Sequence, residues 1–136
     1  MPGGTVARVT VATASGGVSR RGAAAYLVAQ GAVVLGWWVA VLASRTVRGW
    51  FFPSGGLDPA FVAFVLPDLV FVVGGSLLVA RQRLRGNDAP LGTGILLGAV
   101  GYAAVYTLTW TLLLQAPAAG VVAMGVMAIG TWRACR

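Results

Sequence analysis

Asp68 is the residue whose type and position are best suited to chemistry, because it lies inside a long apolar stretch of the sequence. A carboxyl group there can exchange a proton, balance a cation or form hydrogen bonds. Placing a carboxylate at the centre of a bilayer costs at least about 2.5–3.5 kcal/mol on insertion scales, so we expect Asp68 to face the protein interior and to be neutral or hydrogen-bonded. Two interpretations stay open: a hydrogen bond that fixes helix packing, or a site for a proton, an ion or a ligand.

Three other polar side chains lie at a similar depth in neighbouring apolar stretches. At 1.5 Å per helical residue, Asp68 lies roughly 18 Å from the inner end of its stretch and Tyr102 about 17 Å from that of its own. Tyr106 and Gln30 lie about one helical turn to either side. The predicted intramembrane polar site therefore comprises Asp68, Tyr102, Tyr106 and Gln30.

Glycine and proline residues flank this site. Gly94 and Gly98 form a G-x-x-x-G pattern two turns and one turn before Tyr102, and such a pattern lets another helix backbone approach closely. We therefore predict that both glycines are helix-packing positions. Pro67, directly before Asp68, cannot donate to the carbonyl group one turn earlier and is expected to kink its helix. A broken helix beside an intramembrane acid is a known arrangement in transporters.

The residue types that are missing exclude many chemistries. The chain of 136 residues has no His and one Cys, Cys135. Imidazole bases, His-containing metal sites, Ser-His-Asp sets and paired-cysteine redox centres therefore have no residues to build them. No glycine-rich nucleotide-binding motif stands between a strand and a helix. We expect no catalytic residue, no metal site and no cofactor, and an enzyme is the least favoured class.

The composition places the chain in a membrane. It is 58% hydrophobic and only 10% charged, whereas an average soluble domain is roughly 45–50% apolar and about 25% charged. A chain this short cannot bury that much apolar surface in one water-exposed core. The sequence predicts an all-α polytopic membrane protein, with residues 22–132 forming a four-helix transmembrane bundle. The predicted spans are residues 22–44, 59–80, 91–114 and 116–132, and the last of these is at the short end of what a bilayer needs.

The arginines predict the orientation. Eight of the ten basic residues fall before the first span, between the second and third spans, or after the fourth, and two fall on the other side. The positive-inside rule then places a disordered tail (residues 1–21) and the C-terminal end (residues 133–136) in the cytoplasm.

All basic residues are Arg and all acidic residues are Asp, which suggests a GC-rich coding bias and a bacterial plasma membrane. The predicted interfacial anchors are Trp37, Trp38, Trp50 and Trp110 on the outer side and Trp132 on the inner side.

Two further features concern the ends of the spans. The positively charged cluster Arg81, Arg83 and Arg85 could contact anionic lipid headgroups. The arginines flank apolar runs and form no interleaved basic patch, so nucleic acid is not an expected partner.

Ser19-Arg20-Arg21 resembles the start of a twin-arginine signal, but the apolar run after it is longer than a signal peptide needs. We therefore expect the first helix to be retained.

No motif in the sequence indicates a known family, and three functions remain. The first and preferred one is a non-catalytic membrane subunit or accessory protein, acting as a homodimer or with another membrane protein through its small-residue faces. The second is a small proton- or ion-coupled transporter or channel that uses Asp68. The third is a binding protein or enzyme for an apolar, lipid-like ligand, with Asp68 and Tyr102 as acid and base.

Overall fold

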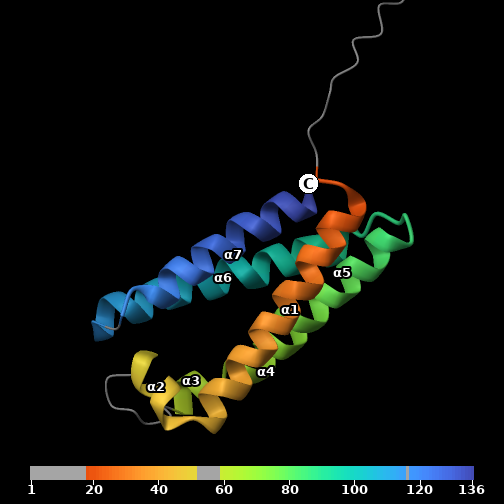
Figure 1. Ribbon diagram of the computed structural model, residues 1–136. Helices are drawn as coiled ribbons and strands as arrows, with labels where there is room; N and C mark the ends of the chain where they lie inside the picture. The colour runs from red at the N-terminus through yellow and green to blue at the C-terminus, as the bar shows by residue number, and fades with distance from the viewer. Residues whose placement is uncertain (1–17, 52–58, 116) are drawn as a thin grey trace, which may run out of the picture.

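The computed structural model describes residues 18–51, 59–115 and 117–136, and within these ranges all regular structure is helical (Figure 1). The predicted tail falls mostly on residues 1–17, which lie outside the described residues. The elements in chain order are α1 (Arg20–Ala43), α2 (Arg45–Phe51), α3 (Pro59–Val62), α4 (Val65–Pro67), the π-helix η1 (Asp68–Gly74), α5 (Gly75–Leu84), α6 (Pro90–Leu114) and α7 (Ala119–Cys135).

Three helices are long and apolar enough to cross a membrane: α1, the continuous segment Val65–Leu84, and α6. At 1.5 Å per residue, the 25 residues of α6 extend about 37 Å, which exceeds the hydrocarbon core of about 30 Å. The fourth apolar helix, α7, has 17 residues and is shorter. The second span was predicted to end at residue 80, but the helix continues to Leu84.

Local signals explain where several helices begin and end. The Ser19 hydroxyl accepts a hydrogen bond from the Gly22 amide at 3.1 Å, so Ser19 caps α1 and the helix includes the two arginines assigned to the tail. Pro90 occupies the first turn of α6, where no amide donor is needed. Gln115 adopts a left-handed conformation, with φ of 50°, and ends α6.

The four long segments form two antiparallel pairs. Helix α1 packs against α5, and α6 packs against α7. Figure 1 shows the two pairs meeting where α1 begins and α7 ends, and separating toward the other end. We call the meeting point the narrow end. It contains the buried residues Ala23, Leu27, Gln30, Ser76, Val79, Ala80, Thr131 and Ala134. The opposite part, around Trp38 and Asp68, is the wide end.

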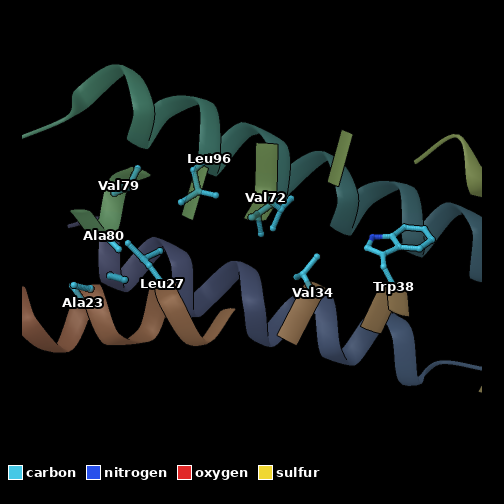
Figure 2. Close-up of a cluster of buried hydrophobic side chains, with 11 residues drawn as sticks. Ala23, Leu27, Val34, Trp38, Val72, Val79, Ala80 and Leu96 are labelled. Carbon is cyan, nitrogen blue, oxygen red and sulfur yellow. The ribbon is translucent and has the colours of Figure 1, made fainter. Parts of the chain in front are cut away.

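The core follows one stripe of α1. Its buried residues recur at helical spacing from Ala23 to Val41. Figure 2 shows Leu27 and Val34 directed toward Leu96 and Val72 of the neighbouring helices, and Trp38 farther along α1. Helix α1 contacts η1 at Gly31, where a Cβ would lie 3.6 Å from the carbonyl oxygen of Val73, an ordinary van der Waals distance. The chain thus builds its core mainly on α1, whereas α6 buries only Leu96 and Val100.

The segment after Pro67 departs from α-helical geometry, whereas the kink predicted at Pro67 itself stays a prediction. Residues Asp68–Gly74 form a π-helix rather than an α-helix, and Gly74 is its last residue. A π-helical segment inserts extra residues into a helix and occurs often at functional sites. This segment carries Asp68 at its first position, directly beside the opening between the two helix pairs.

Candidate functional site

The wide end contains a partly enclosed cavity of about 420 Å³ between the two helix pairs. The second half of α1, the start of η1, the second half of α6 and the first half of α7 all contribute to its wall. Most of the lining side chains are aliphatic or aromatic, and Asp68 is the only charged one among the described residues that line it. The candidate site is therefore an apolar cavity with a single carboxyl group.

Asp68 is held by a tryptophan of α1. The indole Nε1–H of Trp38 donates to Asp68 Oδ2 at 3.0 Å. Trp38 is only 2% exposed, so this tryptophan is a buried partner of Asp68 and not the interfacial anchor we predicted. The indole hydrogen bond orients the carboxyl group at the edge of the cavity.

Aromatic rings form one wall of the cavity. Phe64, which precedes α4, lies against Tyr106 of α6 with ring centroids 4.0 Å apart. Tyr106 is followed one turn later by Trp110, with centroids 5.9 Å apart. All three rings line the cavity, as does Trp37 of α1. The spacing of Tyr106 and Trp110 at i and i+4 places both on the same face of α6.

A second, smaller cavity of about 320 Å³ lies between η1 and α6. Asp68, Phe64 and Val72 border both cavities. Tyr102 borders the smaller one and is 62% exposed. Asp68 thus shares one cavity with Tyr106 and the other with Tyr102, but the residue that hydrogen-bonds to its carboxyl group is Trp38.

Gln30 belongs to a separate, buried polar network. Its side-chain amide donates to Ser76 Oγ of α5 at 3.1 Å, and its carbonyl oxygen accepts from Thr131 Oγ1 of α7 at 2.7 Å. All three side chains are buried. The structure therefore divides the predicted four-residue site: Gln30 joins α1, α5 and α7, whereas Asp68 and the two tyrosines lie at the cavities.

The glycine pattern on α6 has no packing partner within the described chain. A Cβ at Gly94 or at Gly98 would meet no heavy atom within 4 Å. The close helix contact occurs elsewhere: a Cβ at Gly130 of α7 would overlap the ring of Tyr26, whose hydroxyl donates to the Met127 carbonyl at 3.0 Å. The packing role of Gly94 and Gly98 stays a prediction.

The remaining predicted residues occupy different surroundings. Trp37 and Trp110 line the cavity, whereas Trp50 and Trp132 are exposed. The guanidinium carbon of Arg136 lies 4.4 Å from the Trp132 ring centroid. Arg81 and Arg85 are exposed, while Arg83 donates to the Cys135 carbonyl at 2.6 Å and so binds the C-terminal end of α7.

Sequence reasoning missed the two partners that matter most, Trp38 for Asp68 and Thr131 for Gln30. The signal for Trp38 was present: Gln30, Val34 and Trp38 recur at i, i+4 and i+8, which places them on one helix face. A buried glutamine then implies a buried tryptophan two turns later. Thr131 had no comparable signal, because its contact depends on how α7 packs against α1.

The lining of the larger cavity combines apolar side chains with one carboxyl group. Among the described residues, no group of three or more His, Cys, Asp or Glu side chains is placed to hold a metal ion. No family model, no curated protein and no solved structure matches the chain. A function must therefore be inferred from the cavity and its lining residues.

Proposed function

We propose that this chain is a non-catalytic integral membrane protein that binds an amphiphilic ligand in the cavity beside Asp68. The observation that carries the proposal is the cavity itself, of about 420 Å³. Ligand sites are commonly cavities of about 300–1,000 Å³ with apolar walls and a few polar groups that orient the ligand. Asp68, oriented by Trp38, is such a group.

The proposal includes a bilayer around the helices. Large apolar side chains are exposed along every long helix, among them Val39, Leu78, Leu112 and Val126. Such surfaces are expected in contact with lipid. We infer that α7 also spans the membrane, as the fourth helix of the bundle, because it packs against both α1 and α6.

The arginine distribution supports one orientation. Arg20, Arg83 and Arg133 lie at the narrow end, where α1 begins, α5 ends and α7 ends, and the positive-inside rule places this end in the cytoplasm. The cavity then lies in the outer half of the bilayer of a bacterial plasma membrane. An amphiphile within that leaflet is the class of molecule with direct access to the wide end.

Native mass spectrometry of the full chain, released from its own membrane in nanodiscs, tests the proposal. We expect a bound small molecule whose retention falls at least tenfold in Ala123→Phe, because the ring fills the cavity that Ala123 lines. Val122→Phe is the matched control, since Val122 is the preceding residue of α7, is exposed and does not line the cavity. Equal retention in the two variants, or no retained molecule in the unmodified protein, overturns the proposal.

A second candidate, the subunit or accessory role, is favoured by α6. Its glycines Gly94 and Gly98 are exposed with no heavy atom within 4 Å of an added Cβ, and small residues of this kind allow close helix contacts in membranes. The same spectra measure the mass of any second polypeptide. A partner that is lost in Gly98→Leu and retained in Gly36→Leu supports this role, because Gly36 of α1 is equally open.

A further inference from the structure

We propose that the headgroup bound in the Asp68 cavity is an alkylated ammonium, so that the ligand is a cationic amphiphile with a tertiary or quaternary amine. This inference rests on the proposed function and adds the charge and type of the headgroup. Three features of the cavity carry it: the isolated carboxyl group, the aromatic wall and the small number of hydrogen-bond acceptors.

The isolated carboxyl group sets the sign of the charge. Asp68 is the only charged residue among the described residues that line the cavity, and within those residues its carboxyl group accepts a single hydrogen bond, from Trp38. A cation next to Asp68 would be attracted strongly, because an apolar cavity screens charge far less than water does. An anionic headgroup would be repelled by the same carboxylate.

The aromatic wall favours a cation of low charge density. Phe64, Tyr106 and Trp110 lie in succession along the cavity, and Trp37 lines it from α1. Aromatic faces attract cations through their quadrupole, and groups of such rings are a recurrent means of binding alkylated ammonium ions. Asp68 lines the same cavity as these four rings, and its carboxyl group is bonded to a fifth aromatic side chain, that of Trp38.

The mostly apolar lining favours an alkylated ammonium over a primary amine. A primary ammonium has three N–H donors, each of which needs an acceptor. The side chains that offer oxygen acceptors in the wall are those of Asp68, Tyr106, Thr107 and Thr111, and the other lining side chains are mainly aliphatic or aromatic. Alkyl groups on the ammonium match that lining better than N–H donors do.

The rest of the wall suits an alkyl tail. Val33, Ala123, Met124 and Met127 line the cavity on the α1 and α7 sides. Methionine side chains are flexible and polarisable, so they adapt to chains of different shape. The tail would leave between the two helix pairs at the wide end, where the bilayer surrounds them.

The experiment measures binding of decyltrimethylammonium to the full chain in nanodiscs by the fluorescence of the cavity tryptophans. Decyldimethylamine N-oxide at pH 8 is the probe of nearly equal shape and no net charge. We expect saturable binding of the cation, weakened at least tenfold by Asp68→Asn, and little effect of that change on the N-oxide. The amide introduced by Asp68→Asn still offers an oxygen to the Trp38 indole. Asp88→Asn is the control, because Asp88 is an exposed acid outside the cavity.

The outcomes separate the two proposals. If both probes bind equally and Asp68→Asn changes neither, the cationic headgroup is wrong and the amphiphile site stands. If neither probe binds saturably while Ala123→Phe still excludes a retained molecule, the cationic headgroup is wrong and the amphiphile site stands. If Ala123→Phe and Val122→Phe retain that molecule equally, the amphiphile site itself fails. If Asp68→Asn does not fold, Phe64→Leu is the variant that tests the inference, because it keeps the apolar lining and the charge of Asp68. We then expect the affinity for the cation to fall and the affinity for the N-oxide to stay unchanged. An unchanged cation affinity in Phe64→Leu overturns the aromatic part of the inference.

Discussion

The narrow and wide ends differ in how many hydrogen-bond partners their polar side chains have. At the narrow end, Gln30 is bonded on both sides of its amide, by Ser76 and by Thr131, and three helices are joined. At the wide end, Asp68 accepts one indole hydrogen bond and borders two cavities. The polar groups of the narrow end satisfy one another, whereas the carboxyl group of the wide end can still interact with a ligand.

This contrast indicates that the polar side chains at the two ends of the bundle have different roles. Fully paired polar groups in an apolar interior specify which helices meet and at what depth. A group with only one partner contributes less to packing but can bind something from outside. Under the function proposed above, stability depends mainly on the narrow end and ligand binding on the wide end.

The largest expected effect tests packing at the two ends. Leu27→Ala removes a fully buried side chain at the narrow end and should lower the free energy of unfolding by about 2–5 kcal/mol. Met124→Ala, at the cavity, should lower it by less than about 1 kcal/mol, because the surroundings already contain a void. Denaturation by SDS in mixed micelles measures both. Equal losses would mean that the two ends are packed alike.

A smaller effect is expected where α1 and α7 come closest. Gly130→Ala places a methyl group against the ring of Tyr26, which must move and release its hydrogen bond to the Met127 carbonyl. We expect a loss of about 1–3 kcal/mol, typical of overpacking. Gly125→Ala on the same helix meets nothing within 4 Å and should be neutral or stabilising by up to about 1 kcal/mol. If Gly130→Ala is tolerated as well as Gly125→Ala in thermal melts, the close contact is not a determinant of packing.

The smallest effect concerns the polar network. Thr131→Val removes the hydroxyl that donates to Gln30 at 2.7 Å and should cost about 1 kcal/mol, because hydrogen bonds between membrane helices are individually modest. Thr109→Val is the control: its hydroxyl is exposed and bonds only within its own helix, to the Val105 carbonyl at 3.0 Å. A double-mutant cycle with Gln30→Met isolates the pair. A coupling energy of zero would show that Gln30 and Thr131 act independently.

Much of the helical architecture could be predicted from the sequence. Apolar length alone located α1 and α6 to within two residues at each end, because the hydrophobic thickness of a bilayer restricts how long such a stretch can be. Pro67 predicted a kink, and the structure has a π-helix that begins at the next residue, which the sequence did not predict. Depth counting grouped Asp68 with Tyr102 and Tyr106; each tyrosine lines one cavity that Asp68 also lines, but the hydrogen bond to the carboxyl group comes from Trp38.

What the sequence left open is rotation about the helix axes. Depth follows from counting residues, but partners depend on which way each helix faces, and a nearly uniform apolar helix carries little information on that. Trp38 was therefore assigned to the interface by residue type, whereas the stripe shared with Gln30 and Val34 buries it. Gly94 and Gly98 were assigned to packing by their pattern, and the contact made within this chain is that of Gly130 with Tyr26.

The π-helix at Asp68–Gly74 links the two ends of the molecule through rotation. Each α-helical residue turns the chain by about 100° around its axis, and a π-helical residue turns it by less, because its hydrogen bonds span five residues instead of four. Asp68 and Ser76 therefore lie at a different angle to each other around the axis than they would in a continuous α-helix. A substitution that restored α-helical hydrogen bonds in this segment would turn the Asp68 carboxyl group relative to the Ser76 hydroxyl that contacts Gln30.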